Sequence, residues 1–371
     1  MKKLSNILLA LALALVFTVP AMAIHIGDKD SPEGSLGITG NYRIDGESVD
    51  IDGNKADYMD DDFDLSIVME RGPVKGYVSL ELSDRTFVGD AGGSPGGGDD
   101  AKIPAVDNYY IEWTAMDNLK VKMGEWGLGF ARSIGTDGAG ASNIQVTYMM
   151  DALDITGTLS KEVEGWSGTD DDNDTLMIKV DGKQAGPFTT ASVVSFTQMN
   201  DLSGTENSYI GLDLALPLGP VDLAFEYGGN GGDLDGEFFA LFVDLAFIQN
   251  FGVTVNYFLS SDDYTPYEGA DWSPTAIFGD NINEELIDMS ALWLEFTYDV
   301  NDKLRIGAQA LVLAENDNGD EYGTEIGAGL TYKLADNVTY KAAFSSYAEG
   351  DGVHSEDVDY DELFHTLSFK F

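Results

Sequence analysis

The sequence predicts an all-β protein, a transmembrane antiparallel β-barrel of about 18 strands. Three observations predict it: short segments in which polarity alternates, connecting links that are short and long in turn, and a last segment that ends on an aromatic residue. Alternation gives each strand one apolar and one polar face, because successive side chains point to opposite sides of a sheet. In a membrane barrel the apolar face meets lipid and the polar face meets an aqueous interior.

The alternation recurs along the whole chain. In segments such as 36–44 and 251–259, apolar residues hold one parity, and charged residues or Gly often hold the other. We expect strands at roughly 35–44, 60–70, 73–83, 106–115, 118–126, 141–150, 153–161, 174–182, 187–199, 207–216, 220–228, 236–247, 251–260, 288–300, 302–314, 323–333, 336–347 and 361–371. Sixteen strands is the alternative count, if segment 118–126 or, after it, segment 153–161 fails to form.

The links between these segments distinguish a barrel from a soluble sandwich. Even-numbered links are tight, as at Arg71-Gly72 and Met116-Asp117, and odd-numbered links are mostly long and polar. A sandwich gives no reason for this order, whereas membrane barrels have short turns at one rim and long loops at the other. The long links are also acidic. Acids concentrate in 45–61, 162–174, 261–287, 315–322 and 348–360, where Lys55 is the one base.

The last eleven residues, DELFHTLSFKF, place Leu363, Leu367, Phe369 and Phe371 on one parity. This segment resembles the closing strand of Gram-negative outer-membrane barrels. The resemblance implies that Leu367, Phe369 and Phe371 form an assembly signal read by the barrel-assembly machinery. We expect the strand to close the barrel by pairing with 36–44, and deletion of Phe371 to impair assembly but not secretion.

Residues 1–23 have the pattern of a secretory signal peptide. Two lysines precede a short apolar run, and Ala21-Met22-Ala23 has the spacing of a cleavage site. No later stretch holds 18 consecutive apolar residues, so no spanning helix is expected. We expect residues 24–371 to form a single barrel domain.

Composition excludes several classes of function. The absence of Cys excludes disulfides, thiolate nucleophiles, Cys-based zinc sites and a lipoprotein anchor. A formal net charge of −45 disfavours nucleic acid as a partner and favours cations. An aromatic content of 11% indicates an ordered protein despite this acidity. An enzyme is not expected, because His25, His354 and His365 show no catalytic spacing.

The mature chain as a whole resembles the Gram-negative outer-membrane porin family. The resemblance implies location in the cell outer membrane, contact with its lipid and lipopolysaccharide, and a homotrimer. A barrel of 16 to 18 strands is too wide for side chains to fill. We therefore expect a water-filled channel for passive diffusion of small hydrophilic solutes or ions, with a preference for cations.

Charged residues on the polar parity are the candidate pore lining. They are Arg43, Lys75, Glu81, Glu112, Lys120, Lys122, Arg132, Asp213, Asp222, Glu226, Asp244, Glu295 and Arg305. The bases of the first third and the acids of the middle would face each other and create a transverse field. Ordinary ion pairing within the wall is the alternative. Porin resemblance also implies that an outer loop folds inward, and we favour 127–140 over 84–105 and 261–287.

No defined metal site is expected. Carboxylates suit Ca²⁺ or Mg²⁺, and Asp170, Asp171, Asp172 and Asp174 form the densest acidic run. Weak divalent binding at the outer loops, or bridging to lipopolysaccharide phosphates, is therefore the one cofactor considered. A solvated loop surface is the alternative.

Two other functions stay open at this point. The barrel could anchor surface polymers through divalent cations, or it could surround a cytochrome as the sheath of an electron-transfer conduit. Bilayer conductance separates both from a porin, since neither requires an open pore.

Overall fold

The computed structural model describes a barrel wall of long strands. The described residues are 24–28, 30, 34–51, 54–89, 105–128, 141–162, 173–183, 188–200, 206–232, 236–261, 289–315, 321–349 and 360–371. The signal-peptide prediction for residues 1–23 lies outside them. No helix in the described part of the chain is long and apolar enough to cross a membrane.

The strands follow one another along the chain as a meander. Their bounds are β1 (Ile24–Asp28), β2 (Gly34–Ile51), β3 (Asn54–Arg71), β4 (Val74–Gly89), β5 (Ala105–Met116), β6 (Leu119–Glu125), β7 (Ala141–Met149), β8 (Leu153–Glu162), β9 (Asn173–Gly182), β10 (Thr190–Asn200), β11 (Glu206–Leu218), β12 (Val221–Gly232), β13 (Glu237–Ile248), β14 (Phe251–Ser260), β15 (Met289–Asp299), β16 (Leu304–Glu315), β17 (Glu321–Ala335), β18 (Val338–Glu349) and β19 (Tyr360–Lys370).

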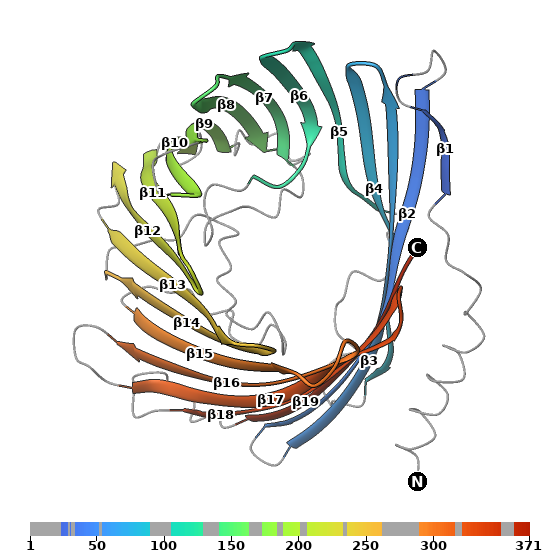
Figure 1. The fold of residues 1–371 in the computed structure, drawn as a ribbon, viewed down its shortest axis with the longest axis vertical. Coiled ribbons are helices and arrows are strands. Elements are labelled where there is room, and N and C mark those ends of the chain that lie inside the picture. Colours follow the sequence, from blue (N-terminus) through green and yellow to red (C-terminus); the bar gives the residue numbers. More distant parts are fainter. Residues whose placement is uncertain are drawn as a thin grey trace.

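Strands β2 to β19 close into a ring (Figure 1). Every consecutive pair is antiparallel, and β19 pairs with β2, where Leu367 lies opposite Ile44. Within the described residues the barrel therefore has 18 strands, β2 to β19, which confirms the predicted fold class and excludes the count of sixteen. The segments 118–126 and 153–161, on which that alternative rested, form β6 and β8.

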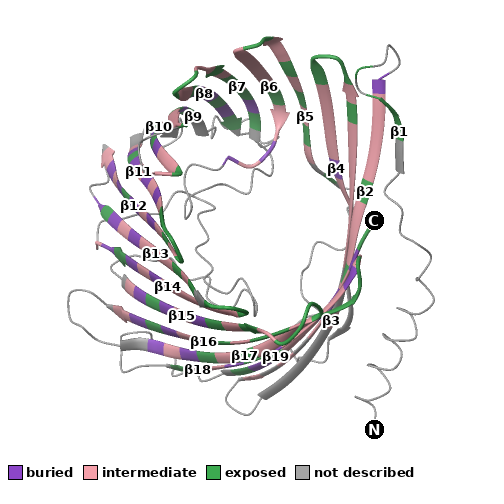
Figure 2. Ribbon diagram, viewed as in Figure 1, coloured by how far each residue is buried: buried purple, intermediate pink, exposed green. Residues whose placement is uncertain are grey.

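Register separates an outer apolar face from an inner face. On β5 and β6, Trp113 lies opposite Val121 and Ile111 opposite Met123, while Glu112 lies opposite Lys122 on the other side of the sheet. The apolar members of these strands are exposed on the outside, which produces the alternating burial along the strands in Figure 2. Aromatic side chains lie on this outer face near the short turns, as expected of an interfacial girdle. Examples are Trp113, Tyr298 and Tyr332.

Two parts of the fold differ from the sequence expectation. Most of the predicted acidic loop 45–61 is paired strand, because β2 and β3 extend to Ile51 and Asn54 with only two residues between them. Acids occupy both parities here, so polarity does not alternate and the strand pattern fails. Asp52-Gly53, a residue pair typical of hairpin turns, is the sequence signal that indicates the hairpin. The short strand β1 was not predicted either.

The predicted assembly signal lies at the seam between β19 and β2. The backbones of Phe371 and Gly40 exchange two hydrogen bonds of 2.9 and 2.8 Å. The Phe371 ring covers Gly40, where a Cβ would overlap it, and lies 6.0 Å from the Phe63 ring. Leu367 and Phe369 are buried, and Tyr42 and other neighbours pack against them.

The partner of the closing strand is only partly the predicted one. The prediction that the last strand pairs with the first barrel strand is confirmed, but its partner is Asn41–Ile51 rather than 36–44. The lower part of β2, from Gly34 to Ile38, pairs instead with β1. The strand β1 thus continues the line of β19 along the same edge.

Candidate functional site in the barrel interior

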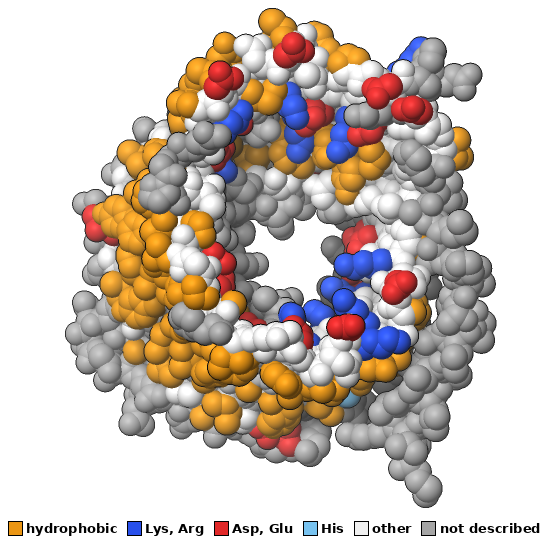
Figure 3. Space-filling view, in the orientation of Figure 1, with side chains coloured by type: hydrophobic (Ala, Val, Ile, Leu, Met, Phe, Trp, Pro, Cys, Tyr) orange, Lys and Arg blue, Asp and Glu red, His pale blue; other side chains and the backbone are white. Residues whose placement is uncertain are grey.

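Charged side chains line the open interior of the barrel in Figure 3. The predicted pore-lining residues occupy the strand parity that points inward, with the exception of Arg132, which lies outside the described residues. The register between strands determines which residues lie opposite them. Glu81 lies opposite Asp64, Glu112 opposite both Lys75 and Lys122, and Glu295 opposite Gln309.

Two of the bases on β2 to β6 are engaged by acids of the same wall. Arg43 contacts Asp45 through Nε at 2.5 Å and Asp62 through Nη2 at 3.3 Å. The Nζ atom of Lys120 lies 3.5 Å from Glu112 Oε1. Ordinary ion pairing within the wall, the alternative raised from sequence, therefore holds for these two bases.

The acids on β11 to β13 form a wall of one sign. Asp213 lies directly opposite Glu226, and Asp222 lies opposite Asp244. The hydroxyl of Thr254 donates a hydrogen bond of 2.5 Å to Asp244. The wall lies across the interior from β2 to β6 (Figure 1).

The wall between these two carries hydroxyl and amide groups together with paired charges. Strands β7 to β10 turn hydroxyl and amide groups inward, and these groups bond to one another. Gln145 Nε2 donates to Thr158 Oγ1 at 3.1 Å, and the hydroxyls of Thr147 and Thr156 are 3.1 Å apart. The charges on this wall are paired as well, since Lys179 Nζ lies 3.4 Å from Asp181 Oδ1 and Lys183 Nζ lies 2.7 Å from Asp154 Oδ1.

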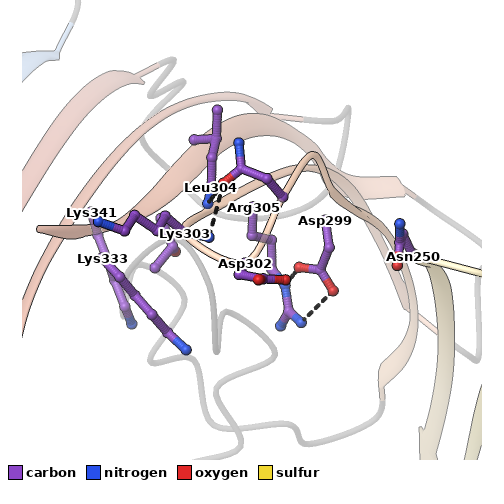
Figure 4. Close-up of a pocket in the computed structure, with 10 residues that line it drawn as sticks. Asn250, Asp299, Asp302, Lys303, Leu304, Arg305, Lys333 and Lys341 are labelled. Atoms are coloured by element: carbon purple, nitrogen blue, oxygen red, sulfur yellow. Dashed lines mark hydrogen bonds and ion pairs between the residues drawn. The ribbon is translucent and has the colours of Figure 1, made fainter. Parts of the chain in front are cut away.

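A basic hollow of about 480 Å³ opens at the rim with the short turns. Its lining is Asn250, Asp299, Asn301, Asp302, Lys303, Leu304, Arg305, Thr331, Lys333 and Lys341. Figure 4 shows that these residues come from the turns after β13 and β15 and from β15 to β18. We call this set the basic hollow.

One ion pair organises the basic hollow. Arg305 grips Asp299 with two hydrogen bonds, from Nε at 2.7 Å and from Nη2 at 3.1 Å. This two-pronged geometry is the strong form of an Arg–carboxylate pair, and it uses two of the five N–H donors of the guanidinium. In register, Thr331 stands between Arg305 and Lys341. The basic hollow also presents the ammonium groups of Lys303, Lys333 and Lys341.

Sequence reasoning placed Arg305, Lys333 and Lys341 on the polar parity, but it did not predict that they meet turn residues in one hollow. Lys333 and Lys341 stand on the polar parity, which is a usable signal for an inward position. Asn250, Asn301 and Lys303 belong to turns of two hairpins. Their meeting depends on how adjacent hairpins align, and no pattern within one strand encodes that.

An apolar belt on the inner face was also missed. It consists of Tyr209, Phe238, Phe258, Ala291, Trp293, Leu311 and Leu313, all buried near the ends of the strands that lead to the long links. The Phe238 ring is stacked 6.1 Å from Tyr209 and 5.8 Å from Phe258. A sequence signal exists in 237–242, EFFALF, which is apolar on both parities and so predicts a strand buried on both faces.

The structure offers no defined metal centre among the described residues, where no group of three or more His, Asp or Glu side chains is placed to hold an ion. The acids Asp170, Asp171 and Asp172 lie outside the described residues. Asp174 is in β9 opposite Met199, and its side chain is not described. Divalent binding at the outer links stays a prediction.

The fold is that of solved outer-membrane porins of Pseudomonas aeruginosa. OpdO matches with a TM-score of 0.62 at 17% identity, over 91% of this chain and 97% of that one. OccK2 (OpdF), solved in complex with glucuronate, matches at 0.61 and 15%, over 91% and 98%. OccK11 (OpdR) matches at 0.59 and 14%, over 91% and 96%. No family model matches the sequence, and a search of curated proteins gives no significant match.

Proposed function

From a closed 18-strand barrel with the fold of the outer-membrane porins, we propose that this chain is a porin of the Gram-negative outer membrane. It forms a water-filled channel through which small hydrophilic solutes and ions diffuse passively. The observation that carries the proposal is the charged inner face around an open interior (Figure 3). A barrel of this strand number encloses more space than its inward side chains fill.

The channel prefers cations over anions of the same size. Two features support this part of the proposal: the net charge of −45 and the exposed carboxylates of Asp222 and Asp244 in the acidic wall of β11 to β13. A passage lined by one sign of charge concentrates the opposite ion. Arg43 and Lys120 offset this effect little, because each already has a carboxylate partner.

The basic hollow adds a local site for solutes that carry a carboxylate. Three lysines surround it: Lys303 in the turn after β15, Lys333 in β17 and Lys341 in β18. An ammonium group binds a carboxylate as a point charge with three donors. OccK2 (OpdF), which shares the fold, was solved with glucuronate, a sugar acid of this kind. Small sugar acids are therefore the solute class proposed for this hollow.

Planar-bilayer recording tests the channel proposal. The purified protein is expected to open a stable conductance, with a reversal potential in a KCl gradient that favours K⁺. A sealed barrel would contradict the porin function and leave the anchor and the conduit as the functions to test. A conducting pore with anion preference would contradict only the cation preference.

Liposome swelling tests the sugar-acid site. Glucuronate is expected to enter faster than glucose once diffusion rates are matched, and the double variant Lys333→Gln/Lys341→Gln is expected to abolish this advantage. The control is Lys120→Gln, which removes a base that already has a carboxylate partner. The proposed site is wrong if both variants behave alike.

Two further predictions concern partners. The homotrimer implied by the porin resemblance is checked by crosslinking in native membranes. Divalent binding by the outer links is checked by calcium titration of vesicles that contain the barrel, with the cluster Asp170, Asp171, Asp172 and Asp174 replaced by Asn as the matched variant.

A further inference from the structure

The chain leaves β6 on the inside of the barrel. Figure 1 shows the coil after β6 turning into the interior, and its described residues, 126–128, are called the inward coil. Trp126 is 7% exposed and Leu128 is 4% exposed. Both belong to the same contiguous buried cluster as Met177 of β9 and Val194 of β10. The inward coil thus lies over the inner face between β6 and β10 and takes up space there.

Lys122 contacts the inward coil through its charge. The Nζ atom lies 3.9 Å from the ring centroid of Tyr110 and 3.9 Å from that of Trp126. The two rings meet nearly edge to face, 6.0 Å apart at 72°. Tyr110 is itself stacked on Tyr77 at 5.0 Å, so the first ring is held by the wall. A cation shared by two ring faces attracts both, and more strongly where water is excluded.

Asn143 of β7 holds Trp126 by a hydrogen bond. Its Nδ2 atom donates a hydrogen bond of 2.8 Å to the backbone oxygen of Trp126, and its side chain is 2% exposed. A buried carbonyl that has left the sheet needs such a partner. Trp126 is therefore held through its ring by β6 and through its backbone by β7.

We propose that Lys122, together with Asn143, is a positioning residue that fixes the inward coil against the wall and so sets the width of the channel at this level. The inference rests on the proposed function, because the width matters only if solutes pass. Lys122 acts here through the rings it contacts rather than as a charge offered to ions. Lys120, two residues away on the same strand and face, contrasts with it, since its partner is Glu112.

A single thiol tests the position of the inward coil directly. The chain contains no Cys, so Leu128→Cys gives one reporter at a buried site. In barrels inserted in vesicles, maleimide labelling of this thiol is expected to be slow. Addition of Lys122→Met is expected to raise the labelling rate roughly tenfold, the scale for loss of a desolvated cation–π contact. Lys122→Arg keeps the contact and is expected to label slowly.

Bilayer conductance of the same series, without the thiol, is the second measurement. Lys122→Met is expected to give a larger and noisier single-channel current than Lys120→Met, although both remove one lumen charge. Asn143→Ala is the second variant for the case that Lys122→Met does not insert, and it is expected to raise labelling at position 128 as well.

The outcomes separate the inference from the proposed function. Equal labelling and equal current noise in Lys122→Met and Lys120→Met would overturn the positioning role, even while every variant conducts. Faster labelling in a barrel that never conducts would keep the contact but contradict the porin function. Slow labelling in Asn143→Ala, if Lys122→Met fails to insert, would also overturn the inference.

Discussion

The inner face of β11 to β17 is apolar and buried at one end of the strands and charged and open at the other. We call the end that leads to the long links the outer end, and the end at the short turns the turn end. At the outer end, Phe238, Trp293 and Leu311 of the apolar belt are at most 5% exposed. At the turn end, Asp299 and Arg305 line an open hollow. The parity is the same in both halves. Periodicity thus determines which side chains point inward, while packing inside the barrel determines whether water reaches them.

The largest expected effect comes from the apolar belt. Phe238 is 1% exposed and stacks between two rings. We expect Phe238→Ala to lower the free energy of unfolding by about 3–5 kcal/mol, because a buried aromatic leaves a cavity. The measurement is the urea midpoint followed by circular dichroism in lipid vesicles. The control is Asp222→Ala on the neighbouring strand in the open half, and an equal loss in both variants would erase the difference between the halves.

A smaller loss of stability is expected where rings of the apolar belt pack against a glycine. A Cβ added at Gly228 would overlap the rings of Tyr209 and Phe238. We expect Gly228→Ala to cost about 1–3 kcal/mol through overpacking, measured by the same midpoint. Gly157 on the outer face of β8 has open space around it, so Gly157→Ala is the matched control. Wild-type stability in Gly228→Ala would show that the belt is loosely packed.

Replacing a carboxylate by its amide should change the free energy of unfolding in opposite directions at the two ends of the strands. Glu325 is 1% exposed; it accepts one hydrogen bond from Gln309 at 3.1 Å, and its Oε2 atom has no partner. We expect Glu325→Gln to raise the free energy of unfolding by about 1 kcal/mol, because the cost of burying an ionisable carboxyl group that has no counter-charge is removed. Asp299→Asn, which weakens an exposed ion pair, should lower it by less than about 1 kcal/mol. The unfolding midpoints at neutral pH decide, and two losses would contradict the comparison.

The smallest effect on stability is expected for Lys333 and Lys341, the two lysines of the basic hollow that lie on β17 and β18. Lys333→Gln and Lys341→Gln are expected to change the free energy of unfolding by less than about 0.5 kcal/mol, as for surface substitutions in general. The same variants should slow glucuronate entry, because they remove the ammonium groups proposed to bind its carboxylate. A clear drop in the unfolding midpoint would show that these lysines are structural.

Most of the wall could be predicted from the sequence. The segment expected at 251–260 coincides with β14, and the last strand was correctly assigned as the closing one. Lipid outside and water inside impose the same alternation on every spanning segment, so the signal repeats along the chain. The outer part of the hairpin β2–β3 was not predicted, because it has polar residues on both parities and therefore no alternation to detect.

The candidate site was less predictable, for two physical reasons. Residues such as Asn250 and Lys303 meet in the basic hollow only because neighbouring hairpins align, which is a property of register between strands. The apolar belt depends on what packs inside the barrel, and Trp126 shows that part of the chain does so. Inward polarity follows from local pattern, whereas inward packing depends on contacts between distant segments.

The shared edge of β2 has a consequence for the order of folding. Strand β1 pairs with Gly34–Ile38 a few residues away in the chain, whereas β19 reaches Asn41–Ile51 from the far end of the sequence. Short loops close far faster than long ones. The lower part of this edge is therefore expected to be occupied early, and the upper part to stay free until nearly the whole meander has formed. Amide exchange during refolding should protect Ile38 before Ile44, with the seam as the last stage of folding.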